Sequence, residues 1–566
     1  MLEQDKLITP PDKSPPKRTF NALVNNPVME DYALRYAPRS FRKWSEFTVV
    51  GAALGGIAYM ADFAIGGSIT VSYGFSNAFW AILIVAGIIF LTGIPIAYYS
   101  ARYNIDMDLL TRGAGFGYLG STLTSVIYAS FTFIFFSLEG SVMAQALNLY
   151  FGISIPIAYL IAALGIIPLV LFGMTFLSQL QQKSQVLWLT LMIVPFIAVL
   201  AKDPGSFSRW THFAGSSPSG SGFSPLLFAA AAGVALSLIA QIGEQADYLR
   251  FMPDLTVKNK KKWWIAVILA GPGWVILGAA KQLGGSFLAS YISPSVGLTK
   301  ADQPIEMFLH AYGTLFIGAG VALLVATLYV LVSQVKINVT NAYSGSLSWS
   351  NFFSRIFHIH PGRVIWLLLN VGIALALMEG NVFSVLNYIL GFYSNVAVAW
   401  IGAVVADLVI NKPLKLSPSY IEFKRAHLYN FNPVGFGAML LGSLVSVLAF
   451  FNLFGPTIQA WSPFIALGLA FIASPIIALI TKGKYYIARE PLPEEHPASS
   501  TLGSEAAASA AEITCGVCTF PFEPEDTAFC PFHSSSICSL CCSLDKECHD
   551  ACKKTEVAVA IKSVSH

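Results

Sequence analysis

One carboxylate, Glu139, stands inside a long apolar and aromatic segment of this chain. It follows Phe135 by four residues, so the two side chains are predicted to share one face of a helix. A charged carboxylate is costly in hydrocarbon, which favours a functional role for Glu139 over a structural ion pair. An ionised carboxylate accepts ligand N–H groups, a protonated one carries a proton, and an aromatic face stacks on a planar ring. The pair therefore predicts a binding site for a flat, hydrogen-bonding ligand.

Two further apolar segments carry polar groups suited to the same ligand. Gln241 and Glu244 belong to the polar run at residues 241–247, and Asn338 and Asn341 stand three residues apart on one predicted helix face. An amide both donates and accepts hydrogen bonds, as the edge of a heterocycle requires. We predict Gln241 or Glu244 in the pocket together with the asparagines. A packing role for either asparagine is the alternative.

Three other charged residues in these segments are candidates for coupling or gating. Asp62 is predicted to pair with Lys281 or Lys336, or to line the pathway. Asp247 lies close to Arg250 and either contacts the ligand or forms a cytoplasmic gate ion pair. Lys336 either occupies the place of a bound cation inside the bundle or extends its ammonium to the headgroups.

The elements that must position these residues are membrane spans. Only 11% of the 566 residues are charged, 55% are hydrophobic and the mean hydropathy is +0.63. A soluble fold of this length does not need that composition. The apolar segments predict about twelve transmembrane helices, at residues 47–73, 77–99, 123–150, 155–174, 185–200, 223–249, 263–289, 315–343, 364–378, 382–409, 434–454 and 460–480.

The basic residues indicate how the chain crosses the membrane. Lys and Arg concentrate in every second loop, whereas the intervening loops carry only Lys202, Arg209 and Lys300. Basic loops resist translocation and are held by the anionic leaflet, so both termini are predicted in the cytoplasm, in a plasma or inner membrane. The net charge of +3 is thus a feature of topology and does not predict a nucleic-acid partner.

The first and sixth segments are predicted to be broken helices. The first is rich in glycine, including Gly55 and Gly66, and the sixth carries Gly233 and then the polar run at 241–247. They stand five spans apart, as in the inverted five-plus-five repeat of a secondary transporter, whose substrate lies at the midplane between broken helices. The alternative is that the glycines only allow close helix packing.

Three motifs carry a resemblance to a known family. Residues 104–112 with 115–121 resemble the loop after the second span of cytosine and purine permeases, 245–251 resemble their sixth span, and 338–344 their eighth. In order and spacing they resemble the nucleobase:cation symporter family, which also holds hydantoin and allantoin permeases, and within it a bacterial cytosine-permease-like branch. The resemblance covers residues 26–484. It implies an all-α polytopic LeuT-type fold, with a five-plus-five inverted repeat plus two helices, and cation-coupled uptake of a planar heterocycle.

The resemblance also implies roles for single residues. It places a stacking aromatic group and a polar group at Phe135 and Glu139, where a Trp and a Gln or Gly are more usual, and a ligand-binding Asn at Asn338. Family members that use sodium carry small hydroxyl residues near the position of Lys336. That departure weakens the case for Na⁺ and favours coupling to H⁺, or no coupling.

The C-terminal part of the chain is a separate cysteine-rich module. All eight cysteines lie between Cys515 and Cys552, and their two-residue spacers are typical of tetrahedral zinc sites. A reducing cytoplasm favours metal over disulfides. The candidate ligands suffice for two structural Zn²⁺ ions, with a redox or iron–sulfur role or an unstructured tail as alternatives. They are Cys515, Cys518, Cys530, His533, Cys538, Cys541, Cys542, Cys548 and Cys552.

The sequence therefore predicts a cytoplasmic tail at 1–46, a transporter domain at 47–482, a flexible linker at 483–513, the cysteine-rich module at 514–554 and a tail at 555–566. The predicted function is import of a nucleobase or related planar N-heterocycle, of the cytosine, purine or allantoin class, by proton or sodium symport with alternating access. The alternative is a transporter-like nutrient sensor whose cysteine-rich tail docks a cytoplasmic protein. No nucleophile and base pair is apparent, so an enzyme is not predicted.

Overall fold

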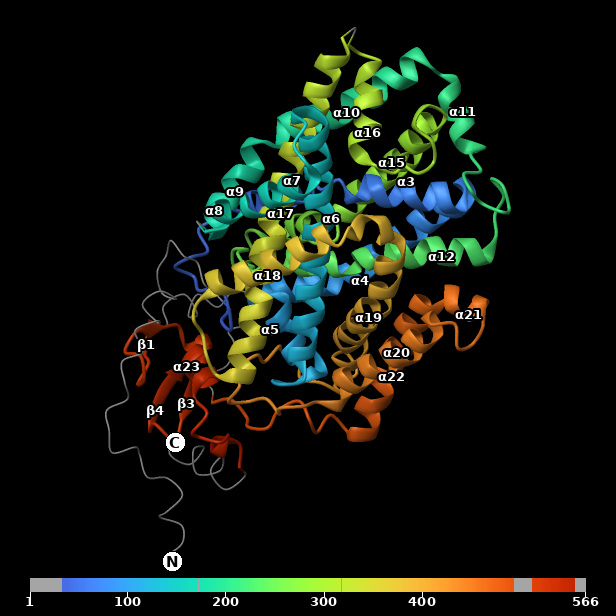
Figure 1. The fold of residues 1–566 in the computed structure, drawn as a ribbon. Coiled ribbons are helices and arrows are strands. Elements are labelled where there is room, and N and C mark those ends of the chain that lie inside the picture. Colours follow the sequence, from blue (N-terminus) through green and yellow to red (C-terminus); the bar gives the residue numbers. More distant parts are fainter. Residues whose placement is uncertain (1–32, 172, 317, 493–511, 555–566) are drawn as a thin grey trace, which may run out of the picture.

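The computed structural model is a helical bundle with a small module that contains short strands against one end (Figure 1). It describes residues 33–554 apart from 172, 317 and 493–511. Most of the predicted tail at 1–46 and of the predicted linker at 483–513 therefore lies outside the described residues. The tail predicted at 555–566 lies wholly outside them.

The bundle is built from helices, the structure in which a single segment satisfies its own backbone hydrogen bonds inside a membrane. In chain order they are α2 (Glu46–Gly56), α3 (Ala61–Tyr73), α4 (Phe75–Tyr103), α5 (Met107–Thr111), η1 (Arg112–Phe116), α6 (Ser121–Phe151), α7 (Ile155–Leu164), α8 (Ile167–Val170), α9 (Gly173–Lys183), α10 (Gln185–Lys202), α11 (Gly205–Thr211), α12 (Pro225–Ala235), η2 (Leu236–Gln241), α13 (Ile242–Leu249), α14 (Lys260–Ala270), α15 (Trp274–Val296), α16 (Pro304–Gly313), α17 (Ala319–Phe357), α18 (Arg363–Glu379), η3 (Val382–Val385), α19 (Leu386–Ala406), η4 (Asp407–Asn411), α20 (Pro433–Phe450), α21 (Pro456–Ala460) and α22 (Ser462–Thr481).

Within the described residues, nine helices are long and apolar enough to cross a membrane, and the bent pair α2 and α3 makes a tenth. Two of the predicted spans are shorter than this. The segment predicted at 155–174 is divided between α7 and α8 near Gly165, and α18 has 17 residues. The chain is an integral membrane protein, as its composition predicted.

The predicted break in the first span is confirmed. Helix α2 ends at Gly56 and α3 begins at Ala61, with a 46° bend between them. The glycines also pack helices closely, because a Cβ on Gly66 would lie 1.9 Å from the backbone oxygen of Gln282 in α15. The glycine-rich segment therefore contains a break and also packs closely against α15, so close packing is not its only role.

The sixth span, predicted to be broken, is one continuous helical segment from Pro225 to Leu249. The polar run at 241–247 is mostly helical in α13, and the irregular stretch is the 3₁₀ helix η2, which precedes it. The polar side chains of α13 are buried inside the bundle. The prediction of a broken sixth span was therefore wrong, and the 3₁₀ turn of η2 is its one irregular stretch.

The module consists of two antiparallel hairpins and a short helix. Its elements are β1 (Ile513–Thr514), β2 (Pro521–Phe522), η7 (Pro524–Asp526), β3 (Thr527–Cys530), β4 (Ser535–Cys538), α23 (Ser539–Leu544) and η8 (Ala551–Lys553). Strand β1 pairs with β2 and β3 pairs with β4. Helix α17 contacts α23, so the module lies against the bundle, as its position in red in Figure 1 shows.

The chain just before α2 completes this module. Leu34 is fully buried in the same apolar cluster as Cys515, Val517 and Phe522. The Arg35 guanidinium stacks over the Phe522 ring at 4.5 Å and forms a buried 2.6 Å ion pair with Asp526. Residues 33–39, which were predicted as part of a tail, are therefore folded into the module.

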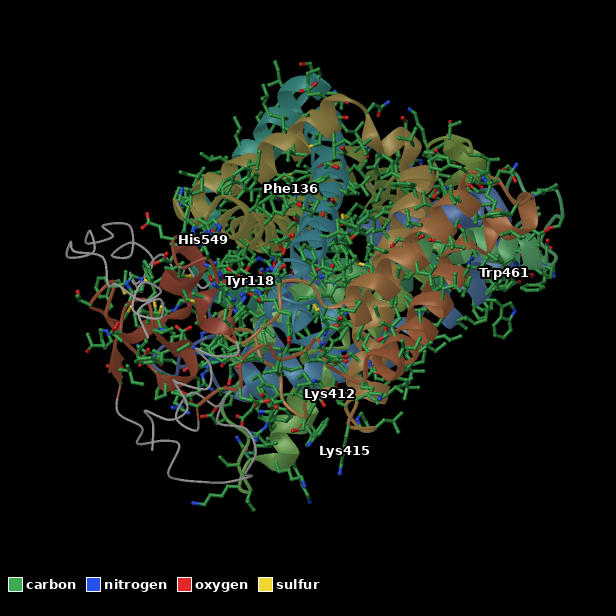
Figure 2. All side chains as sticks on the ribbon, turned by 90° about the horizontal axis from the view of Figure 1, so that it is seen from below. Tyr118, Phe136, Lys412, Lys415, Trp461 and His549 are labelled. Carbon is green, nitrogen blue, oxygen red and sulfur yellow. The ribbon has the colours of Figure 1, made fainter. Side chains whose placement is uncertain are left out.

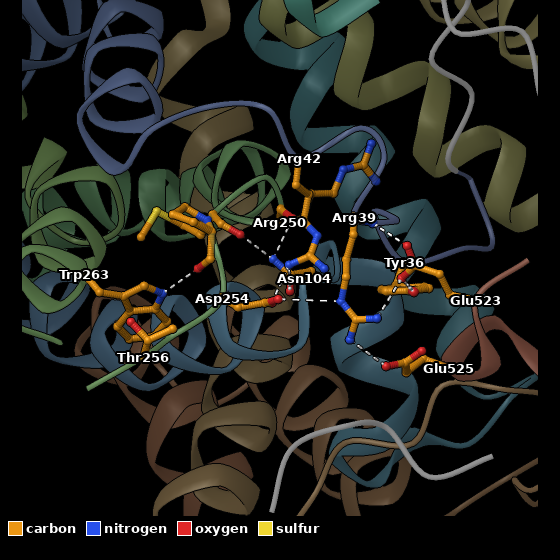
Figure 3. A network of polar contacts seen from close by, with 12 residues as sticks. Tyr36, Arg39, Arg42, Asn104, Arg250, Asp254, Thr256, Trp263, Glu523 and Glu525 are labelled. Atoms are coloured by element: carbon orange, nitrogen blue, oxygen red, sulfur yellow. Dashed lines mark hydrogen bonds and ion pairs between the residues drawn. The ribbon is translucent and has the colours of Figure 1, made fainter. Parts of the chain in front are cut away.

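A polar network continues from this segment to the bundle (Figure 3). Arg39 pairs with Glu525 of the module at 3.0 Å and with Asp254 at 3.6 Å. Arg42 donates to Asp254 at 2.6 Å and to the side-chain oxygen of Asn104 at 2.8 Å. Burial alone would raise the pKa of Asp254, but the two arginines hold that pKa below its ordinary value. The segment thus connects the module to the loops after α4 and α13.

The opposite edge of the module is also anchored. Arg425 donates to the backbone oxygen of Cys542 at 2.7 Å and pairs with Asp550 at 3.0 Å, and Arg489 donates to the backbone oxygen of Phe529 at 2.8 Å. Tyr118 and His549 line a cavity of about 610 Å³ between module and bundle and lie near each other in Figure 2. The module is therefore bound to the bundle on two sides.

We expect Leu34→Asp to release the module from the N-terminal segment. A buried charge replaces an apolar side chain, at a cost of about 3 kcal/mol or more. The measurement is hydrogen–deuterium exchange at residues 33–39, which should speed up in Leu34→Asp while Arg425 and Arg489 still hold the module on the bundle. Leu414→Asp, at a 61% exposed leucine of a loop, should leave this exchange unchanged. Slow exchange at residues 33–39 in both variants would contradict the expectation.

Candidate functional site

Glu139, from the middle of α6, is fully buried and caps the break in the first span. Its Oε1 accepts the N–H of Ala61 at 2.9 Å, and its Oε2 accepts the N–H of Met60 at 3.1 Å. These are orphan amides at the start of α3, where a negative charge is favourable. Gln334 of α17 donates to Oε2 at 2.5 Å. The carboxylate therefore joins three spans at the break.

Lys281 of α15 occupies the other side of the same break. Its Nζ donates to the backbone oxygens of Ile57 at 2.6 Å and Tyr59 at 3.0 Å, and lies 3.0 Å from Oδ2 of Asp62. It also lies 3.8 Å from the centroid of the Tyr59 ring. Gln282 donates to the other oxygen of Asp62 at 2.9 Å. An ammonium here contacts the carbonyls at the end of α2, a position that favours a cation.

These contacts decide between the lysines proposed from sequence. Asp62 pairs with Lys281, whereas Lys336 donates to the backbone oxygen of Gln181 and to Ser184 Oγ, both at 2.8 Å. Lys336 is buried, so its ammonium does not extend to headgroups. The lysine that contacts the backbone at the break is Lys281. For Lys336 the sequence left two alternatives open, the place of a cation inside the bundle or an ammonium extended to the headgroups.

The polar residues of the sixth span lie close to Glu139. Gln241 donates to Oε2 of Glu244 at 2.6 Å, and the charges of Glu244 and Glu139 are near enough to interact. Within the described part of the chain, Oε1 of Glu244 and both amide atoms of Gln245 are buried without a hydrogen-bond partner. Buried polar atoms are normally hydrogen-bonded, so these atoms are candidates for hydrogen bonds to a ligand or to water. Gln245 was not among the predicted site residues, yet its amide offers both a donor nitrogen and an acceptor oxygen without a partner in the described residues.

The two asparagines of the eighth span lie together, as their spacing predicted. The Asn341 amide donates to Asn338 Oδ1 at 3.3 Å, and the Asn338 amide lies 3.5 Å from the backbone oxygen of Phe136 in α6. Among the described residues, Oδ1 of Asn341 has no partner. Phe135 is buried, with its ring centroid 4.5 Å from that of Phe131. The aromatic and amide groups predicted for the site are therefore in the core, with one amide oxygen still available.

Asp247 and Arg250 do not form the ion pair considered as a gate. Asp247 accepts hydrogen bonds from Tyr128 at 2.9 Å and from Ser344, while Arg250 pairs with Asp106 at 3.1 Å. The Arg250–Asp106 pair is buried and joins the loop after α4 to the end of α13. Asp106 belongs to the motif at 104–112.

Asp407 lies in a buried polar cluster at the end of the span formed by α19 and η4. Asp407 is buried in η4, with Lys412 Nζ 3.7 Å from its Oδ2 and the Tyr486 hydroxyl donating to its Oδ1. The π-helical turn of η4 brings Asn411 to the same carboxylate at 3.2 Å. Lys412 is the cation that faces this buried carboxylate, and Tyr486 and Asn411 donate to it.

Four cysteines of the module form a compact cluster. The sulfur atoms of Cys515, Cys518, Cys538 and Cys541 all lie within 4.8 Å of one another, and those of Cys518 and Cys538 are 4.0 Å apart. A tetrahedral zinc ion with Zn–S bonds of about 2.3 Å requires sulfurs about 3.8 Å apart. Hydrogen bonds from neighbouring thiols, that of Cys518 foremost, lower the pKa of Cys515. The cluster, hereafter the Cys515 cluster, fits a structural zinc ion.

The fold is similar to that of solved membrane transporters. A structure of Mhp1, a nucleobase-cation-symport-1 family transporter in a closed conformation with bromovinylhydantoin bound, matches with a TM-score of 0.58 and 17% identity over 82% of this chain and 100% of Mhp1. The chain has the fold of Mhp1. The inward-facing conformation of Mhp1 matches with a TM-score of 0.53 and 16% identity, over 78% of this chain and 94% of that one.

A second transporter has the same fold. The substrate-bound outward-open state of a Na⁺-coupled sialic acid symporter matches with a TM-score of 0.56 and 13% identity, over 81% of this chain and 93% of that one. No family model and no curated protein matches the chain. The likeness to Mhp1 confirms the all-α polytopic LeuT-type fold that the motifs implied.

Proposed function

We propose that this chain is a secondary active transporter that imports a flat N-heterocycle of the nucleobase or hydantoin class, in the nucleobase:cation symporter family. The observation that carries the proposal is the broken first span, whose amides are held by the buried Glu139 and whose carbonyls are held by the buried Lys281. Unwound backbone at membrane depth is typical of substrate and ion sites in transporters. Mhp1, which shares the fold, is described with a hydantoin bound. The neighbours give no support to a sensor.

The ligand would bind among Phe135, Glu244, Asn338 and Asn341, with Gln241 positioning Glu244. Unpartnered amide and carboxylate atoms suit the N–H and C=O edge of a heterocycle, and the phenyl ring offers a stacking face. Glu139 holds the break beside this group. Alternating access would loosen these contacts at the break and at the Arg250–Asp106 pair.

Coupling to protons suits the site better than coupling to sodium. The Lys281 ammonium already binds the carbonyls of Ile57 and Tyr59 and the carboxylate of Asp62, which are the oxygen ligands that a sodium ion would need. A proton exchanged at Asp62, Glu139 or Glu244 requires no second cation at the break. We assign Asp247 to the support of Tyr128 and Ser344 near the gate.

Uptake measurements test the proposal. Proteoliposomes that contain the full chain are given radiolabelled cytosine, adenine, hypoxanthine, uracil, allantoin or hydantoin under an imposed proton or sodium gradient. The proposal expects saturable uptake of one of these compounds, driven by the proton gradient. Uptake driven by sodium alone would overturn the coupling, and the absence of both binding and uptake for all of them would overturn the substrate class.

We propose that both termini face the cytoplasm and that the Cys515 cluster holds a structural Zn²⁺ ion. Arg425 and Arg489 belong to the basic loops and lie at the end of the bundle that carries the module. Basic loops stay in the cytoplasm, which supports a cytoplasmic position for this end. All eight cysteines are free thiols, as a reducing compartment allows. A closed four-thiolate site is structural and leaves no position for a reacting water.

We expect Cys515→Ser to remove this zinc ion and to unfold the module. A structural zinc site contributes about 10 kcal/mol or more to the folding of a small domain. Limited proteolysis should then cut within 512–554, whereas Ser536→Ala, on β4, should leave the module resistant. A module of Cys515→Ser that stays resistant to protease would show that metal does not hold its fold.

A further inference from the structure

The four cysteines outside the Cys515 cluster line one cavity of the module. Cys530 ends β3, Cys542 lies in α23, and Cys548 and Cys552 belong to the last loop and to η8. The chain has eight cysteines. Every cysteine is therefore in one of two groups of four, and the second group converges from separate elements.

Four thiols at one cavity need an explanation other than packing. An apolar pocket of a small module can be filled by any aliphatic side chain, and cysteine is absent from the whole membrane bundle. Four thiolates are a complete donor set for tetrahedral zinc. All four are free thiols, so disulfides do not account for their grouping.

Positive side chains surround this group. A zinc ion with four thiolates carries a net charge of −2, which nearby cations stabilise. Arg425 lies near enough to Cys542 and Cys548 to interact with their charge, and Arg489 near enough to Cys552. Both arginines come from the bundle and are already fixed by hydrogen bonds to the module. The bundle therefore supplies the charge that a second metal centre would need.

His533, a predicted ligand, has a different partner. Its Nε2 lies 2.6 Å from Oδ2 of Asp545, and Asp545 itself lines the cavity. The other oxygen of Asp545 accepts the N–H of Glu547 at 2.9 Å. His533 and Asp545 thus fix the start of the last loop, and the donor set at the cavity is complete without the imidazole.

We propose that Cys530, Cys542, Cys548 and Cys552 form a second zinc site. This proposal rests on the proposed zinc binding by the Cys515 cluster, but the second site has its own four ligands. In the structure only the Cys515 cluster has all four sulfurs within 4.8 Å among the described residues, so binding at the second site draws the last loop toward β3. The first site closes the core around Leu34, and the second holds the last loop against Arg425.

The metal content of the full chain tests this. Purified in detergent under reducing conditions and measured by elemental mass spectrometry, the wild type is expected to hold two zinc ions per chain. The Cys548→Ser/Cys552→Ser variant is expected to hold one, and Ser536→Ala two. One zinc in the wild type, or two in the double variant, would overturn the second site. The first result would leave both the Cys515 cluster and the transport proposal in place.

A second measurement covers the case in which the double variant misfolds. Native wild-type chain is alkylated before and after a chelator is added, and the modified cysteines are identified by mass spectrometry. Cys530, Cys542, Cys548 and Cys552 should be protected until metal is removed and should then react together. Reaction of these four at full rate before chelation, or an intact mass lower by a disulfide's two hydrogens, would refute the site.

Discussion

Replacing Glu139 by Gln is expected to lower the initial rate of substrate uptake on the order of 100-fold, at unchanged protein level in the membrane. The carboxylate accepts the N–H groups of Met60 and Ala61 and the amide of Gln334. The glutamine side chain has only one acceptor oxygen, so its NH₂ group faces at least one of these three donors without forming a hydrogen bond. Hydrogen bonds to charged groups contribute about 1.5–3 kcal/mol each, so one lost bond and one repulsive contact are sufficient for this effect.

Uptake by proteoliposomes checks this, with Glu379→Gln as the matched control. Glu379 ends α18 and is exposed, so its neutralisation should leave uptake within about twofold of wild type, as for most surface substitutions. Calorimetry then measures substrate binding by Glu139→Gln. Lost binding would indicate a damaged binding site, whereas retained binding would indicate a blocked transport cycle. Wild-type uptake by Glu139→Gln would show that the cap on the first span has no part in transport.

Replacing Lys281 by Met should both destabilise the protein and abolish uptake. The substitution leaves the Asp62 carboxylate buried without its ion-pair partner and leaves the carbonyls of Ile57 and Tyr59 without their donor. Removal of one member of a buried pair costs about 3–5 kcal/mol. Thermal unfolding of the detergent-solubilised protein should show a lower midpoint, and Lys281→Met with Asp62→Asn should recover much of the loss, because the two effects are coupled.

Lys336→Met is the control for this variant. It removes a buried ammonium that donates to Gln181 and Ser184 and that forms no ion pair with an acid of the described residues. Its effect on the midpoint should be smaller. A further experiment measures the unfolding midpoint of Lys281→Ala in sodium chloride and in choline chloride. Sodium should raise this midpoint if the vacated carbonyls form a cation site. Equal midpoints for Lys281→Met and Lys336→Met would contradict the assignment of Lys281 to the break.

The sequence predicted those features that depend on local patterns. A carboxylate among phenylalanines identified Glu139, the glycine-rich first segment identified the break near Asp62, and three motifs identified the fold. Two-residue spacers likewise identified the cysteines as candidate ligands. These features could be predicted because a polar group in a membrane span is energetically costly, so its presence in an apolar segment indicates a functional site.

The pairings could not be predicted, since they depend on how helices distant in sequence pack. Lys281 and Lys336 stand in equally apolar surroundings, and only the close approach of α15 to α3 at Gly66 selects Lys281 as the partner of Asp62. Similarly, Arg250 stands nearer in sequence to Asp247 than to Asp106, yet pairs with Asp106. The predicted break in the sixth span was wrong because a segment with buried polar side chains can remain helical.

The insertion of Leu34 and Arg35 into the module has a consequence for synthesis. Arg35 and Asp526 are separated by 491 positions, and chains fold from the N-terminus as they emerge from the ribosome. Leu34 and Arg35 therefore leave the ribosome long before their partners in the module, which are synthesised after every span. Until then an apolar and a basic side chain stay exposed next to α2. A chain that stops before the module therefore lacks the partners that bury Leu34 and Arg35.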